Sequence, residues 1–232
     1  MTTSIPEASH PTKPRLRGIL HQWGAVFAAG AGMVLVATAP AGRPRFGAAV
    51  FALTLCTLFA VSALYHRVTW EPAARTRMRR LDHASIFLLI AGTYTPLAIV
   101  GLPPGDAGTL LCWIWAGAFL GIAQSVFWVS APKAVSAGLA VAVGWMIVPY
   151  FGSVRAVLGS VATGMLLVGG IAYTLGALAY AFKRPNPVPG VFAYHEVFHG
   201  LTLVAAVLHF AAVLSMMRGA RAASSCRRPR RR

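Results

Sequence analysis

Long apolar stretches recur along almost the whole chain, separated by short segments rich in charged residues, proline and glycine. Each stretch holds about 20 mostly apolar residues, the length that an α-helix needs to cross the hydrocarbon core of a bilayer. The pattern therefore predicts an all-α membrane protein, folded as a bundle of seven transmembrane helices. The predicted spans are residues 19–39, 46–66, 82–101, 108–129, 134–152, 157–181 and 192–216.

The first span follows basic residues and ends in Ala-Thr-Ala, which resembles a signal-peptide cleavage site. Its apolar part is long for a signal peptide and six further spans follow, so we interpret it as a retained helix. The chain is then expected to divide into an N-terminal cytoplasmic segment, a single membrane domain and a basic disordered tail. These are residues 1–18, 19–216 and 217–232.

Composition agrees with a membrane protein. Hydrophobic residues make up 57% of the chain and charged residues 11%, whereas soluble domains carry about 25% charged residues. The formal net charge of +16 is more typical of cytoplasmic loops and contact with anionic lipids than of nucleic-acid binding. We therefore expect membrane lipids as partners and no nucleic acid. Three cysteines without CxxC spacing predict neither a disulfide framework nor a thiolate metal site.

Lysine and arginine are unevenly distributed between the two sides of the predicted bundle. One side carries Lys13, Arg15, Arg17, Arg67, Arg75, Arg77, Arg79, Arg80, Lys133, Lys183 and Arg184, and the other carries Arg43, Arg45 and Arg155 before the tail. The positive-inside rule then predicts a plasma-membrane protein whose N-terminus is cytoplasmic. The arginine-rich tail, SSCRRPRRR, would lie outside, against the same rule.

The few polar residues within the spans gather at span ends. Ser62 and His66 close the second span four residues apart, Asp82 opens the third, and His195 and His199 open the seventh. A helix places residues four apart on one face. Because consecutive spans alternate in direction, all of these ends lie at the same membrane face.

Ionisable side chains at membrane depth are costly and indicate function. Three histidines with an open fourth position are a typical zinc site of hydrolases, and His66, His195 and His199 supply that number. Asp82 can then hydrogen-bond the zinc-bound water, and Ser62 can steady the same network. Any one of these histidines alone is better explained as a helix-end residue bonded to a carbonyl or a headgroup. Their convergence from separate helices favours zinc.

Other polar residues have simpler interpretations. His195-Glu-Val-Phe-His199 matches the H-E-x-x-H pattern of zinc proteases, which would make Glu196 a general base, but an acid in the first helical turn is also explained by the helix dipole. His21 and His83 are expected at the membrane interface. His209 lies about 21 Å deeper than His195 along the same helix, and we expect a hydrogen-bonded interior side chain there.

Several short sequence motifs, taken in chain order, resemble those of the hemolysin III family. They are RGILHQWGA, SALYH, LDHASIF with AGTYTP, and HEVFHGLTLVAAVLHF, and the resemblance covers residues ~14 to ~216. That family belongs with the progestin and adipoQ receptors and, more distantly, with the alkaline ceramidases. The resemblance implies seven helices, an internal N-terminus and a zinc site near the cytoplasmic face. It assigns zinc binding to His66, His195 and His199, the bond to the zinc-bound water to Asp82, and the helix-two serine to Ser62. It gives Glu196 no catalytic role.

Four functions follow as hypotheses, of which the fourth, an intramembrane metalloprotease, needs Glu196. The first is an intramembrane zinc-dependent hydrolase of lipid amides or esters. The second is a non-enzymatic receptor or structural protein stabilised by zinc. The third, suggested by the family name, is a cytolytic pore-forming protein, although the predicted spans lack a polar stripe.

Overall fold

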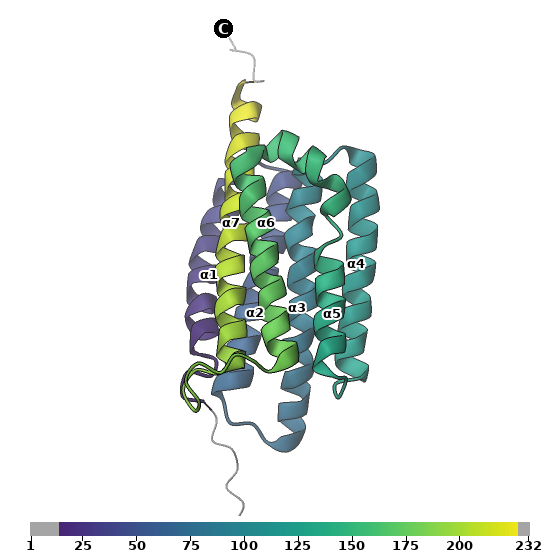
Figure 1. Ribbon diagram of the computed structural model, residues 1–232. Coiled ribbons are helices and arrows are strands. Elements are labelled where there is room, and N and C mark those ends of the chain that lie inside the picture. Colours follow the sequence, from purple (N-terminus) through teal and green to yellow (C-terminus); the bar gives the residue numbers. More distant parts are fainter. Residues whose placement is uncertain (1–13, 227–232) are drawn as a thin grey trace, which may run out of the picture.

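The computed structural model describes residues 14–226, with side chains up to residue 224, and this part of the chain is helical. The elements are α1 (Ile19–Thr38), α2 (Arg43–Arg67), α3 (Pro72–Gly101), α4 (Pro104–Phe127), α5 (Lys133–Gly144), the 3₁₀ helix η1 (Val148–Tyr150), α6 (Phe151–Phe182) and α7 (Tyr194–Cys226). Figure 1 shows them packed side by side as one elongated bundle. Within the described residues there is no sheet, only an isolated bridge between Val188 and Phe192.

Proline marks the start of several helices. Pro44, Pro72 and Pro104 occupy the first or second position of α2, α3 and α4, and Pro132 is the N-cap of α5. Proline suits these positions because its fixed φ is already helical and because the first backbone N–H groups of a helix have no partner within it. Proline thus helps to fix the residue at which each of these helices begins.

Among residues 14–226, six helical segments are long and apolar enough to cross a membrane. Five correspond to α1, α2, α3, α4 and α7, and the sixth is the 50-residue stretch Lys133–Phe182, which includes α5, η1 and α6. The spans predicted at 134–152 and 157–181 have different boundaries here. α5 ends early, at Gly144, and residues 153–156, predicted as a connection, lie inside α6. The irregular point of α6 is Gly159, whose φ of 76° is one that glycine adopts readily.

Helix α3 is the central helix of the bundle. It contacts α2, α4, α5, α6 and α7, and it has the largest buried share of the six spanning segments. At 30 residues it is about 45 Å long, well beyond the ~30 Å hydrocarbon core. Its first turns, which carry four arginines between Arg75 and Arg80, extend past the other helices at the lower end of the bundle (Figure 1).

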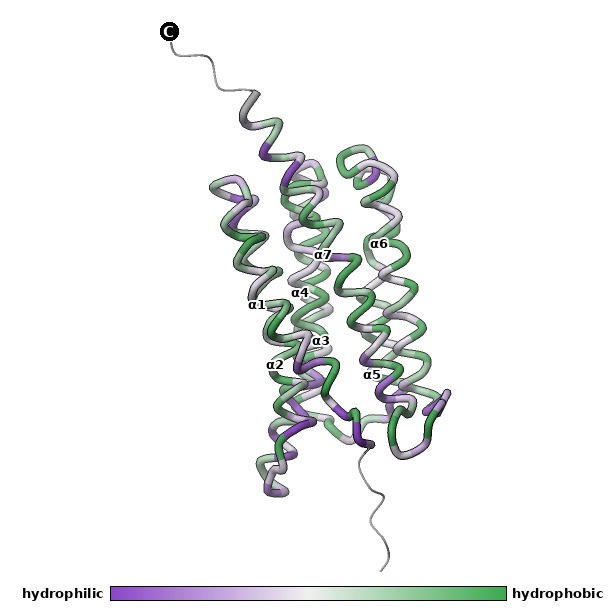
Figure 2. Tube along the Cα trace, turned by 90° about the vertical axis from the view of Figure 1, so that its left-hand side faces the viewer, coloured by the Kyte–Doolittle hydropathy of each residue, from purple (hydrophilic) through white to green (hydrophobic). Residues whose placement is uncertain are grey.

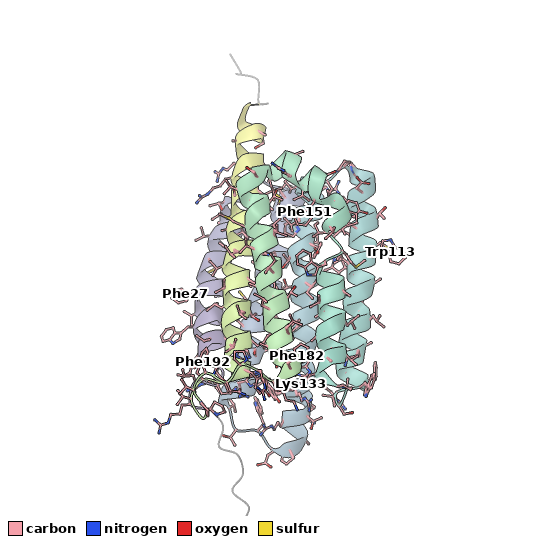
Figure 3. The ribbon with its side chains drawn as sticks, in the orientation of Figure 1. Phe27, Trp113, Lys133, Phe151, Phe182 and Phe192 are labelled. Atoms are coloured by element: carbon pink, nitrogen blue, oxygen red, sulfur yellow. The ribbon has the colours of Figure 1, made fainter. Side chains whose placement is uncertain are left out.

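The outer surface of the bundle is apolar. Large side chains such as Phe27, Trp113 and Phe182 are 71%, 61% and 72% exposed, and Figure 3 shows Phe27 and Trp113 projecting from opposite flanks. Hydrophilic residues concentrate at the lower end, where α2 ends and α3 begins, while the helices between the two ends are mostly hydrophobic (Figure 2). Exposed apolar area of this extent is typical of a surface that faces lipid.

Helix α1 packs between α2 and α7 through small residues. Its buried face holds His21, Gly24, Ala28, Gly32 and Leu35. A Cβ at Gly24 would lie 3.0 Å from the Phe59 ring, and one at Gly32 would lie 3.0 Å from the Ala52 Cβ. This close approach of backbones is common between membrane helices, and it brings His21 into the bundle.

Arginines cap the C-terminal end of α1, at the end of the bundle away from His21. The Arg45 guanidinium donates to the Ala39 carbonyl at 2.9 Å, and Arg221 donates to the Thr38 carbonyl at 3.2 Å. The last carbonyls of a helix lack partners within it and carry partial negative charge. Arg221 can reach Thr38 because α7 continues to Cys226, so residues 217–226, expected in a disordered tail, are helical. The rest of that tail, 227–232, lies outside the described residues.

We expect Gly92→Ala to lower the free energy of unfolding by about 1–3 kcal/mol, the usual cost of overpacking. A Cβ at Gly92 would lie 1.9 Å from the Thr54 hydroxyl and 2.7 Å from the Thr54 Cβ, so α2 and α3 would have to separate. The control is Gly30→Ala in α1, where nothing lies within 4 Å. Thermal unfolding in detergent measures both variants, and equal melting temperatures would contradict the predicted close packing.

Candidate metal centre

Three histidines from two helices that are far apart in the sequence meet at the lower end of the bundle. His66 lies in the last turn of α2, and His195 and His199 lie one turn apart at the start of α7. The Nε2 atoms of His66 and His195 are 3.1 Å apart. The three residues form a buried group whose ligand nitrogens all lie within 4.8 Å of one another.

This geometry fits a metal ion. Tetrahedral coordination with metal–nitrogen bonds of about 2.0–2.1 Å separates neighbouring ligand nitrogens by about 3.3 Å, close to the 3.1 Å between His66 and His195. The Nδ1 atom of His199 is buried without a hydrogen-bond partner. Buried polar atoms normally have a partner, and a cation held by this group could serve as the partner of this nitrogen. The group can hold a metal, whose identity the donor set does not fix.

Asp82 and Ser62 lie beside the histidines. The Asp82 carboxylate approaches the His66 Nε2 to 3.7 Å, and both side chains are buried. Asp82 sits in the third turn of α3, because the helix begins ten residues before the predicted span, at Pro72. Asp82 is therefore neither a helix cap nor a first-turn residue, the two positions at which a helix start would explain an acid by itself. Ser62, one turn before His66, is also buried.

Glu196 is bound to partners outside the histidine group. One carboxylate oxygen pairs with the Arg17 guanidinium in a short contact, and the other accepts the Ala193 backbone N–H at 2.9 Å. A glutamate at the third helical position that accepts the N-cap N–H is one half of a capping box. Both oxygens are thus engaged in holding the start of α7, which leaves Glu196 without the geometry of a protease general base.

His21 is deeply buried, contrary to the expected position at the membrane interface. Its ring stacks on that of His199, with centroids 3.7 Å apart and planes inclined by 13°, and its Nδ1 lies 2.8 Å from the Ser62 hydroxyl. Charge and hydropathy gave no sign of this position. The signal that reveals it is the spacing of small residues, because His21 shares one helix face with Gly24, Ala28 and Gly32.

The remaining two histidines among the described residues, His83 and His209, are both partly buried. His83, likewise expected at the interface, is half-buried and lies edge-on to the Tyr180 ring. His209 was expected to be a hydrogen-bonded interior residue, and its Nε2 donates to the Leu166 carbonyl at 3.1 Å. Gly169 makes room for it, since a Cβ there would lie 2.4 Å from the His209 ring.

A largely apolar cavity of about 140 Å³ adjoins the histidines. At the end near the metal candidates it is lined by Ser62, Asp82, His195 and His199. It continues into the bundle between α3, α5, α6 and α7, where it is lined by residues such as Ile90, Ala140, Tyr173 and Trp145. The cavity thus joins a polar end to an apolar interior.

The segment before α1 covers the lower end of this site. The backbone N–H groups of Arg15 and Leu16 donate to the carbonyls of Gly190 and Val191 in the α6–α7 connection. Gly18 lies against the histidine centre, since a Cβ there would be 2.7 Å from the His66 Cβ, and its φ of 82° favours glycine. Lys133, labelled in Figure 3, donates to the Tyr194 hydroxyl at 2.7 Å, so the start of α5 lies at the same end.

We expect Glu196→Gln to lower the free energy of unfolding by about 1–3 kcal/mol, the range for hydrogen bonds to charged groups. The amide keeps the shape but loses the charge that pairs with Arg17. Metal content should be unchanged, because Glu196 is not among the grouped ligands. Arg15→Gln is the control, since Arg15 contacts the connection through its backbone. A variant that loses metal or activity while keeping its melting temperature would restore the protease interpretation.

The family described as Haemolysin-III related matches residues 9–210. The chain is 30% identical over 166 residues to the hemolysin-3 homolog of Bacillus subtilis, covering 71% of this chain and 74% of that protein. It is also 30% identical over 165 residues to hemolysin-3 of Bacillus cereus, covering 71% and 72%. This protein belongs to the haemolysin III family.

Proposed function

We propose that this protein is an intramembrane zinc-dependent hydrolase that cleaves an amide or ester bond of a lipid. The observation that carries the proposal is a buried group of three imidazoles beside a carboxylate, at one end of an apolar cavity within a bundle suited to the membrane. A three-histidine site with an open fourth position is the arrangement of catalytic rather than structural zinc.

His66, His195 and His199 would hold the ion. Zinc in such a site supplies Lewis-acid chemistry, polarising a carbonyl and making water more acidic. Asp82 is the nearest carboxylate, 3.7 Å from the His66 Nε2, and would accept the proton of the attacking water. Ser62, buried beside them, would help to hold this network.

The cavity would orient the substrate. Its apolar interior between α3 and α6 suits an acyl chain, and its polar end suits the amide or ester linkage. Water adds to the carbonyl carbon, the C–N or C–O bond breaks, and the products are a carboxylic acid and an amine or alcohol. The proton taken up by Asp82 passes to the leaving nitrogen or oxygen, so the side chain returns to its starting state.

We also propose that the chain crosses the plasma membrane seven times and that its N-terminus lies in the cytoplasm. α5 begins beside the start of α7, and α6 ends in the connection that leads back to it. The 50-residue stretch from Lys133 to Phe182 therefore leaves one end of the bundle and returns to it. Two crossings account for this path. The basic extension of α3 and the Arg15–Arg17 segment lie at that end, which favours the cytoplasmic side for it.

A second candidate is a non-enzymatic receptor or structural protein. It is favoured by the position of the histidines, because a metal bound to His66 and His195 would fasten α2 to α7. Metal binding would stabilise the folded bundle whether or not the site catalyses a reaction.

Cytolytic activity is a third candidate, drawn from the name of the Bacillus cereus relative, hemolysin-3. The cavity is mostly apolar, and a water-filled channel would need a polar path through the bundle. We rank this function below the other two.

Asp82→Asn should separate chemistry from metal binding. The variant keeps the size of the side chain but cannot accept a proton, so we expect lipid hydrolysis to fall about 10²–10⁴-fold, while zinc affinity falls by no more than ~10–100-fold. His199→Ala should lose both zinc and hydrolysis. The control is Asp106→Asn, an exposed acid in the first turn of α4. The measurements are metal analysis of purified protein and release of fatty acid from a panel of ceramides and esters. Zinc without any hydrolysis in the wild type would favour the structural candidate.

Reporter fusions test the topology. Fusions after residues 70 and 186 should report the cytoplasm, and fusions after residues 105 and 155 should report the opposite side. The fusion after residue 155 distinguishes two crossings by α5 and α6 from none. A fully reversed pattern would mean that the C-terminal arginines set the orientation.

A further inference from the structure

His21 brings a fourth helix to the histidine centre. The three grouped histidines come from α2 and α7, and Asp82 comes from α3. His21 comes from α1, is 2% exposed, and lies against the centre through two different contacts. One contact is the face-to-face stack on His199, and the other is the hydrogen bond to Ser62.

The stack with His21 restrains the ring of His199, and the orientation of that ring decides whether its nitrogens can bind a metal. His199 also has the rings of His66 and His195 edge-on at 5.0 Å and 4.6 Å between centroids. Rotation of the His199 ring about its χ2 angle would move its nitrogens out of the group, and the flat face of His21 at 3.7 Å blocks that rotation. An imidazole bound to a cation carries part of its charge, and a neutral aromatic face is a favourable neighbour for it.

The hydrogen bond fixes His21 in turn. Its Nδ1 is 2.8 Å from the Ser62 hydroxyl, and the Phe59 ring packs edge-on against it at 5.0 Å. Phe59 and Ser62 lie on one face of α2, so this helix holds the His21 ring from two sides. Other buried hydroxyls of the spans, such as Thr93, Thr95 and Ser125, donate to carbonyls within their own helix, whereas Ser62 contacts α1.

We propose that His21 is a positioning residue of the metal centre: it holds the His199 ring in its metal-binding orientation and is itself held by Ser62. This rests on the zinc site of the proposed function. Side chains that orient metal ligands typically contribute 10–100-fold to metal affinity. His21 also makes the centre dependent on α1, which carries none of the three grouped ligands.

The experiment measures Zn²⁺ affinity of the full-length protein in detergent, by competition with a chelator, together with melting temperatures with and without Zn²⁺. His21→Leu removes the stack and the hydrogen bond, and we expect its Zn²⁺ affinity to fall about 10-fold or more. His21→Phe keeps a flat ring and should recover part of that loss. Ser62→Ala removes the hydrogen bond with little change in volume, and should weaken Zn²⁺ binding less than His21→Leu. The two effects should be less than additive, because both variants remove the His21–Ser62 bond, while Ser62→Ala also removes the contact of Ser62 with Asp82.

Leu35→Ala is the structural control, since Leu35 is fully buried on the same face of α1 but at its other end. It should lower the melting temperature equally with and without Zn²⁺ and leave Zn²⁺ affinity unchanged. The inference is overturned if His21→Leu or, where that variant does not fold, Ser62→Ala binds Zn²⁺ as tightly as the wild type. It is also overturned if His21→Leu behaves like Leu35→Ala. Wild-type protein that binds Zn²⁺ but hydrolyses no lipid defeats the enzymatic proposal and leaves this inference standing, whereas wild-type protein that binds no Zn²⁺ defeats both.

Discussion

A bilayer offers no hydrogen-bond partners, so each polar side chain within a span must find its partner inside the protein. This constraint accounts for most of the polar contacts in the bundle. Thr93 and Thr95 donate to carbonyls one turn back in α3, His209 donates to a carbonyl of α6, and the Tyr94 hydroxyl donates to the Gly144 carbonyl where α5 ends. Within the described residues five buried side-chain atoms nevertheless have no partner, and one of them, the His199 Nδ1, belongs to the histidine group.

The same constraint explains which parts of the structure could be predicted from the sequence. Apolar runs of the right length identify α1, α2, α3, α4 and α7, since lipid leaves few alternatives to a continuous helix. Hydropathy is less informative about α5 and α6, because Gly144, Pro149 and Gly159 mark interruptions of the helices within a stretch that is mostly apolar. It also missed the first turns of α3, which are helical because of Pro72 and the residues that follow it but too charged to lie in lipid.

The histidine group was predictable because its members occur at span ends and because alternating helices bring those ends together. Only the position of each end mattered, and an error of one or two residues in a boundary would not have changed the outcome. The roles of His21 and Glu196 depend instead on side-chain direction. Hydropathy does not report which face of α1 turns inward, and the pairing of Glu196 with Arg17 joins segments 179 residues apart.

Residues His66 and His195 are 129 positions apart in the chain, and this separation has a consequence for biogenesis. During synthesis, α2 and α3 emerge and insert long before α7 has been made. His66 and Asp82 must therefore wait in the membrane as a pair, without the imidazoles that complete the group. The N-terminal segment must wait as well, because its partners in the α6–α7 connection come almost as late. The group can therefore form only after α7 has been made, and a chain truncated before Tyr194 lacks two of its three histidines.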